Sequence, residues 1–185
     1  MMDLMLTKEY IKELKTNGNG AIAHLVKEYK DGGSITFILE HLGKLPANFD
    51  GSFLPDLLKH KSASVRLWAI KTLGKLDGDD YLKLLQHAAL SEVDTVVRRE
   101  AVSSIGRMRS KRGQKILFEI LSDKDPKVLS QAIRGLLVFK GETEVDDHLK
   151  SLINHENEMV RTVIYKEFFA TQKAFSSQPH SESYD

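Results

Sequence analysis

Six lysine and arginine side chains recur at helical spacing in four successive segments of the chain. Each segment contains a valine, and the basic residues lie two, six or ten positions after it, on one face of a helix. None of the twelve positions of this kind is acidic, although the net charge of the whole chain is only +1. The six basic residues are Lys71, Lys75, Arg99, Arg107, Arg134 and Lys166.

Lysine and arginine residues gathered on one face can bind phosphate groups or carboxylates. The spacing therefore predicts a partner-binding stripe for a nucleic-acid backbone or an acidic protein surface. Only Trp68 lies near the stripe as an aromatic residue for base stacking, so contacts with DNA or RNA would go mainly to phosphates. The alternative is a solvated basic face, stabilised by the negative C-terminal ends of the helices. Both interpretations stay open.

The elements that position these residues follow from an internal repeat. The four valines are Val65, Val97, Val128 and Val160, separated by 32, 31 and 32 residues. Self-similarity at this period is typical of stacked supersecondary units. No such unit buries its apolar face alone, so stability must come from stacking.

Each repeat is predicted to contain two helices. In the third repeat, apolar residues at helical spacing predict a first helix over residues 114–122. Asp125 is then a good N-cap, Pro126 suits the first helical position, and a second helix is expected over residues 127–139, before Gly141. The equivalent N-cap positions in the other repeats are Ser62, Asp94 and Asn157.

The second helices are expected to bury the same three positions after each valine, and the first helices to add leucine and isoleucine. Position four holds Ala69, Ala101, Ala132 and Ile164; position five holds Ile70, Val102, Ile133 and Tyr165; position eight holds Leu73, Ile105, Leu136 and Phe168. First helices contribute Leu54, Leu57, Leu58, Leu82, Leu85, Leu149, Leu152 and Ile153.

An earlier repeat and two flanking segments complete the predicted organisation. Residues 42–45 repeat residues 73–76 as Leu-Gly-Lys-Leu, which places a degenerate repeat over about residues 20–45. We predict a solenoid over residues 1–172, with an N-terminal capping helix within 7–19 and repeats over 20–172. Residues 173–185 are polar and aperiodic, which indicates a disordered tail or a linker to a further domain.

Composition excludes several classes of function. The chain has no cysteine, so disulfides and thiolate catalysis are absent and a reducing, cytoplasmic location is expected. The N-terminus lacks the pattern of a signal peptide, and the apolar run 136–139 is far too short to span a membrane. No phosphate-loop, dinucleotide or H-E-x-x-H motif is present, and no small-molecule substrate is evident.

The D-x-x-V-R pattern at the second helix, followed by A-x-x-x-L, resembles the HEAT repeat in its short bacterial form. The resemblance covers about residues 20–171 and implies an all-α, right-handed α-α superhelix of about five helix pairs that serves as a binding surface. In this family, arginines such as Arg66, Arg98 and Arg161 commonly pair with acidic caps of adjacent repeats, and we favour that role over an anion-binding ladder.

Two HEAT-like enzymes suggest chemistry that these residues do not support well. His155-Glu156 is similar to the iron-binding pairs of deoxyhypusine hydroxylase, but Lys61 follows His60 where a second glutamate is needed. Trp68 and Glu100 could imitate the cleft of HEAT-like DNA glycosylases, yet packing and surface roles are favoured for both. We therefore predict no catalytic residue, no metal and no cofactor for this segment.

The pattern of the whole chain also looks like the N-terminal HEAT region of some prokaryotic DNA methyltransferases. That resemblance implies a parent enzyme that uses S-adenosylmethionine, while this segment holds DNA or a partner. The leading prediction is a non-catalytic positioning module that is accessory to a DNA-modifying enzyme. Its second helices, with the basic stripe, would line the inner face of the superhelix. The alternative is a protein–protein interaction scaffold with no nucleic-acid role.

Overall fold

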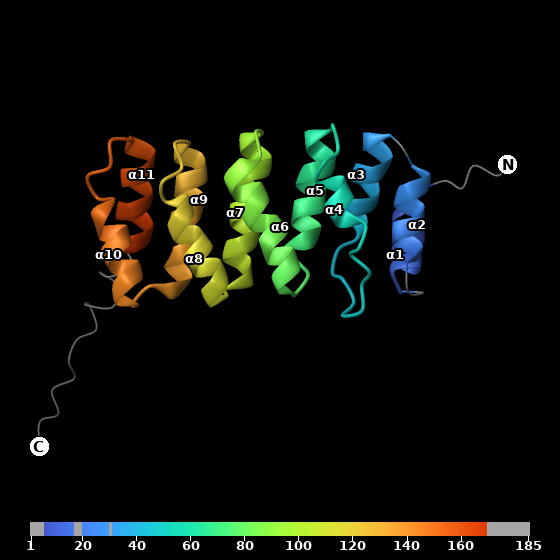
Figure 1. Ribbon diagram of the computed structural model, residues 1–185, viewed down its shortest axis with the longest axis horizontal. Helices are drawn as coiled ribbons and strands as arrows, with labels where there is room; N and C mark the ends of the chain where they lie inside the picture. The colour runs from blue at the N-terminus through green and yellow to red at the C-terminus, as the bar shows by residue number, and fades with distance from the viewer. Residues whose placement is uncertain (1–5, 17–19, 30, 170–185) are drawn as a thin grey trace, which may run out of the picture. The chain divides into compact units, whose positions relative to one another are not determined.

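The computed structural model describes residues 6–16, 20–29 and 31–169, and every regular element in these ranges is helical. Figure 1 shows the helices in chain order. The chain falls into two compact units, which divide between Met108 and Arg109. No helix in the described ranges combines the length and apolar character that a membrane span requires.

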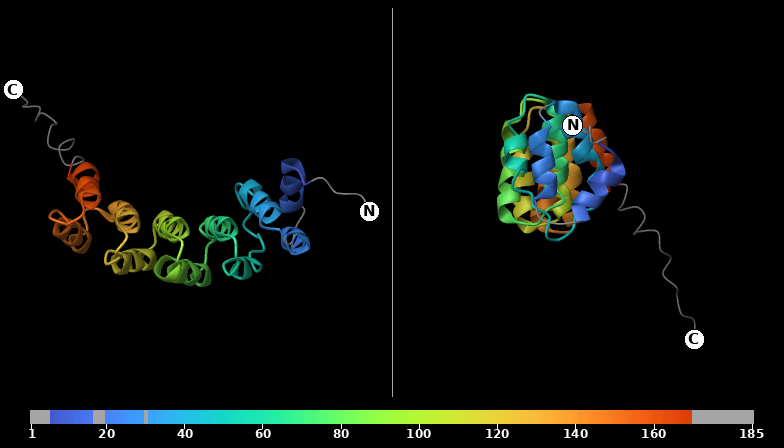
Figure 2. Two further views of the ribbon diagram at one scale, coloured as in Figure 1. Left: turned by 90° about the horizontal axis from the view of Figure 1, so that it is seen from above. Right: turned by 90° about the vertical axis from the view of Figure 1, so that its right-hand side faces the viewer.

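The first unit contains a single N-terminal helix and three helix pairs. Its elements are α1 Lys8–Thr16, α2 Ala21–Glu28, α3 Gly32–His41, α4 Leu54–Leu57, α5 Ala63–Leu73, α6 Asp79–Ser91 and α7 Thr95–Met108. In the left view of Figure 2, the second helices α3, α5 and α7 form one row and α2, α4 and α6 form the other. Neighbouring second helices pack against each other, and α1 packs against α2 and α3.

The second unit continues the pattern with two pairs. Its elements are α8 Lys111–Ile120, α9 Pro126–Leu136, η1 Leu137–Phe139, α10 Thr143–Ser151, α11 Glu158–Val163 and η2 Ile164–Phe169. The last segment is a π-helix that continues α11, and α9 packs against α11. The predicted all-α fold of stacked HEAT-type helix pairs is therefore confirmed. The predicted tail over residues 173–185 lies outside the described residues.

The three predicted core positions of the second helices are buried in all four repeats except at Tyr165, whereas Leu58, Leu152 and Ile153, predicted for the first helices, are only half-buried. Ala69, Ala101, Ala132 and Ile164 are each fully buried, so the second helices approach closely at this position. Tyr165 was predicted to be buried and is 54% exposed, which makes that prediction wrong. It lies in the π-helix, where each turn holds one residue more than an α-turn and the α-helical register no longer applies.

A repeated hydrogen bond sets the turn before the second helices α5, α7, α9 and α11. The residue five positions before the valine accepts the backbone N–H of the N-cap residue through its side chain. The four bonds are His60 Nδ1 with Ser62 (3.0 Å), Glu92 Oε1 with Asp94 (3.0 Å), Asp123 Oδ1 with Asp125 (2.7 Å) and His155 Nδ1 with Asn157 (3.0 Å). Of the predicted N-caps, Asp94, Asp125 and Asn157 also accept N–H groups of their helices, whereas the Ser62 side chain does not.

Close approach of α5 and α7 depends on one glycine. A Cβ atom added to Gly74 would lie 2.6 Å from Ser104 Oγ and 2.7 Å from Ser104 Cβ. The equivalent Gly43 at the end of α3 has open space around it and needs glycine for another reason, because its φ is +60°. The same Leu-Gly-Lys-Leu motif thus meets a packing requirement in one repeat and a backbone requirement in the other.

Candidate interaction surfaces

The six predicted partner-binding residues lie on second helices or just after them. In the first unit, Lys71 is on α5, Lys75 follows α5, and Arg99 and Arg107 are on α7. In the second unit, Arg134 is on α9 and Lys166 is in η2. We call the first four the second-helix basic residues of the first unit.

Two lysines bind the carbonyl groups at the C-terminal end of α3. Lys75 Nζ donates to Gly43 O at 2.8 Å, and Lys15 Nζ donates to Leu42 O at 2.6 Å and to Lys44 O at 2.8 Å. Carbonyl groups at a helix end lack intrahelical partners and carry partial negative charge, so ammonium groups stabilise them. Lys15 was not among the predicted site residues, because it lies on α1, outside the repeat alignment.

The positive charges of this region are close enough to affect one another. Burial lowers the pKa of Lys75, and the nearby charges of Lys15, Arg107 and Lys71 lower it further. Lys71 Nζ also lies 4.3 Å from the centroid of the Trp68 ring, a cation–π contact. Part of the predicted basic stripe is therefore a real cluster within the first unit.

Carboxylates nevertheless reach into the predicted stripe, which the sequence pattern did not anticipate. Arg107 pairs with Glu100 at 2.9 Å and also donates to Ser103 and Ser104. In the second unit, Arg134 pairs with Glu167 at 2.8 Å. The expectation of a stripe without acids is wrong, because Glu100 and Glu167 stand outside the three positions compared. Glu100 reaches Arg107 along α7, and Glu167 reaches Arg134 of α9 from η2. Within the described ranges, the side chains of Arg99 and Lys166 make no hydrogen bond, ion pair or ring contact.

The arginines that directly follow the repeat valines hold the turns together. Arg66, Arg98 and Arg161 each donate to a turn carbonyl of their own repeat, at His60 O (2.8 Å), Glu92 O (2.8 Å) and His155 O (2.7 Å). Arg66 also forms a bidentate pair with Glu92 of the next repeat, at 2.8 and 3.0 Å. The prediction of a pairing role is confirmed for Arg66, although its partner stands two residues before the cap Asp94.

The Arg66–Glu92 pair is mostly sheltered from solvent, with side chains 15% and 10% exposed. Burial alone would raise the pKa of Glu92, but hydrogen bonds from Arg66 and from the Asp94 N–H outweigh it and lower that pKa. The hydrogen bonds that Arg66 donates to Glu92, together with the negative charge of Glu92, raise the pKa of Arg66 despite its burial. Both side chains therefore stay charged and link two neighbouring repeats.

The residues considered for catalysis have structural contacts. His60 and His155 accept backbone N–H groups through Nδ1, as turn residues are expected to do. Trp68 lies beneath Lys71, and Glu100 pairs with Arg107. Within the part of the chain that the structure describes, no group of three or more metal-ligating side chains comes together.

A groove in the first unit was missed by the sequence analysis. It lies between the C-terminal ends of α4 and α6, holds about 420 Å³, and we call it the α4–α6 groove. Its apolar lining is Leu58, Ile70, Ala88 and Val93; its charged lining is Lys59, Lys61, Arg66 and Glu92; and His60, His87 and Ser91 complete it. The sequence feature that could have indicated this groove is the presence of three apolar residues in and beside a polar turn, namely Leu90, Val93 and Val96.

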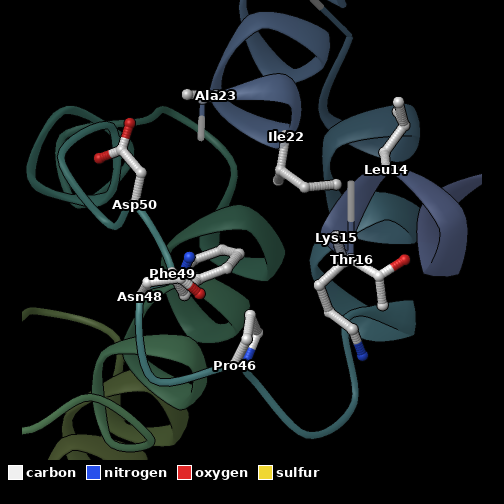
Figure 3. Close-up of a pocket in the computed structure, with 10 residues that line it drawn as sticks. Leu14, Lys15, Thr16, Ile22, Ala23, Pro46, Asn48, Phe49 and Asp50 are labelled. Carbon is white, nitrogen blue, oxygen red and sulfur yellow. The ribbon is translucent and has the colours of Figure 1, made fainter. Parts of the chain in front are cut away.

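Two other pockets are smaller in volume or more open. In the second unit, Arg134 and Lys166 line an open pocket of about 450 Å³ together with Met159 and Glu167, so two predicted residues do meet there. Near the N-terminus, side chains from α1, α2 and the connection from α3 to α4 surround a third pocket (Figure 3). Its volume of about 30 Å³ suits about two water molecules and no larger ligand.

Stacked helix pairs with these turn contacts define a helical-repeat protein. The family profile described as HEAT repeats matches residues 52–106 and 89–166, more than half of the chain, and the chain belongs to this family. None of the curated proteins matches the chain in sequence.

Two solved structures are similar in fold. The complex of CpcE and CpcF of phycocyanin lyase from Nostoc sp. PCC7120 contains a chain with TM-score 0.59 and 21% identity; the match covers 78% of this chain and 96% of that one. A designed armadillo repeat protein in complex with the peptide (KR)4 has TM-score 0.51 and 16% identity, over 88% of this chain and 90% of that one. At these identities the likeness concerns the fold alone.

Proposed function

We propose that the chain is a scaffold that binds a protein partner on the surface of its helical repeats. The observation that carries this proposal is a concentration of exposed apolar side chains at the turn from α6 to α7, where Leu90 is 52%, Val93 87% and Val96 53% exposed. An apolar cluster in solvent is typical of protein interaction sites and offers nothing to phosphate groups.

The comparisons support a scaffold in general terms. One structural neighbour is a component of a two-protein complex, and the other holds a peptide. The HEAT repeat itself builds an extended surface from consecutive helix pairs, with each pair contributing a few side chains.

A nucleic-acid backbone is the second candidate partner, favoured by the cluster of Lys15, Lys71, Lys75 and Arg107 in the first unit. Against it stand Glu100 and Glu167, which neutralise Arg107 and Arg134. A role beside a DNA methyltransferase, with S-adenosylmethionine as cofactor of the parent enzyme, remains a prediction that no comparison supports.

The two candidates are tested by offering both kinds of ligand to the whole chain. Selection from a phage-displayed peptide library should enrich peptides, and a short labelled DNA duplex should show no binding by fluorescence anisotropy at low salt. The opposite result would overturn the proposal: no enriched peptide, and a duplex affinity that falls steeply with salt. Reversal of Lys71, Lys75, Arg99 and Arg107 to glutamate is the control, because it should abolish any such duplex affinity.

A further inference from the structure

We infer that the α4–α6 groove binds an extended segment of the partner that carries both apolar and acidic side chains. This inference rests on the proposed scaffold function and specifies where the partner binds and what chemistry it presents.

The apolar part of the groove is built to receive side chains. Ile70 and Ala88 are buried and close its floor, while Leu58 and the highly exposed Val93 form its walls. Its volume of about 420 Å³ is many times that of the N-terminal pocket. The bidentate Arg66–Glu92 pair joins the two repeats at the groove. A preformed apolar cleft of this kind suits one or two anchoring side chains of a partner.

The charged part of the groove selects an acidic partner. Lys59 and Lys61 are exposed, and neither has an ion pair or a side-chain hydrogen bond within the described residues. Glu92 is the one carboxylate among the groove residues, and its oxygens already accept bonds from Arg66 and from the Asp94 N–H. The groove therefore has three positive side chains and one negative side chain, Glu92, which is already paired with Arg66. Carboxylates of a partner would be attracted to Lys59 and Lys61.

The shape of the apolar surface favours an extended segment over a small molecule. Exposed apolar side chains continue past the groove along the chain at Leu90 and Val96. A nucleic acid is disfavoured, because the groove lining contains no phenylalanine, tyrosine or tryptophan on which bases could stack. An extended peptide can place apolar side chains in the cleft and carboxylates at its rim at the same time.

The test uses the whole chain and a short labelled peptide in which leucine and glutamate alternate. Binding is measured by fluorescence anisotropy at low salt. The double substitution Lys59→Glu/Lys61→Glu should weaken binding by about tenfold. Val93→Asp should weaken it comparably without disturbing the fold, because this side chain is 87% exposed. Amide chemical shifts that change on peptide addition should concentrate on residues 58–61 and 87–93.

Two controls, one variant and one peptide, test whether the binding is specific to the α4–α6 groove. Lys8→Glu/Lys12→Glu makes the same charge change on α1 and should leave the affinity within about twofold. A peptide of alternating leucine and lysine should not bind. The inference is wrong if the acidic peptide does not bind, if all variants bind it equally, or if the shift changes map to the second helices. In each of those cases the library selection still decides the scaffold function independently.

Discussion

Two surfaces of the first unit carry positive charge and differ in what that charge contacts. On the second helices, Lys75 binds the end of α3 and Arg107 binds Glu100, so these side chains already serve the fold. In the α4–α6 groove, Lys59 and Lys61 face solvent beside exposed apolar side chains. The number of basic residues is therefore a poor guide to a binding surface, because availability depends on which acceptors lie within reach.

The largest expected effect comes from breaking the sheltered pair at the base of the groove. Glu92→Ala should lower the free energy of unfolding by about 3 kcal/mol, because it removes the carboxylate that balances the sheltered Arg66 charge and leaves Arg66 Nε, Arg66 Nη2 and the Asp94 N–H without their acceptor. Glu100→Ala removes a more exposed pair with Arg107 and should cost at most about 1 kcal/mol. Urea denaturation measures both values, and equal losses would contradict the distinction between the two surfaces.

The close approach of α5 and α7 gives the next largest effect. Gly74→Ala should destabilise the protein by about 2 kcal/mol, because the added methyl group overlaps Ser104. Gly43→Ala, at the same place in the preceding motif, should cost only about 1 kcal/mol through its left-handed backbone. Thermal unfolding of the two variants ranks them, and a larger loss for Gly43→Ala would reverse our assignment of the two glycines.

The Arg66–Glu92 pair should also make the stability of the protein depend on pH in the acidic range. Because the pKa of folded Glu92 lies below its ordinary value of 4.5, the carboxylate adds stability at neutral pH. That contribution is lost as the pH falls through the lowered pKa, when the folded state must take up the proton. The stability difference between the wild type and Glu92→Gln should therefore shrink from pH 7 towards pH 3. A difference that stays constant over this range would show that Glu92 acts through packing alone.

The smallest effects distinguish the lysines themselves. Lys75→Met should lower stability by about 0.5–1 kcal/mol, because the bond to Gly43 O is lost. Lys59→Met should leave stability unchanged, since no partner is lost on the surface. Chemical denaturation of the two variants under the same conditions measures both effects. Equal losses of stability would mean that Lys59 has a structural role.

Much of the fold was predictable because its signals are local. The N-caps Asp94, Asp125 and Asn157 and the buried alanines depend on neighbours in the same helix or turn, and the 31- to 32-residue period shows that this local pattern recurs. The histidines at positions 60 and 155 were also placed correctly in turns. The prediction that Tyr165 is buried was wrong because it assumed an α-helical register where the chain forms a π-helix.

The candidate sites were predictable only in part. The repeat pattern correctly predicted Lys71 and Arg107 on second helices and near Lys75, which lies just after α5, but it compared only three positions in each repeat and so missed Glu100. It also overlooked Lys59, Lys61 and Val93, since a turn residue in a polar context carries no periodic signal.

The amino-acid sequence by itself determined most of the helices, three of the four predicted caps and, apart from Tyr165, the buried face of the second helices, because these follow from spacing along a single segment. Tertiary structure decided which charges are paired and where apolar side chains from α4, α5 and α6 enclose a groove. Coulomb attraction and cavity shape depend on distances through space between segments, and stacking of the repeats sets those distances.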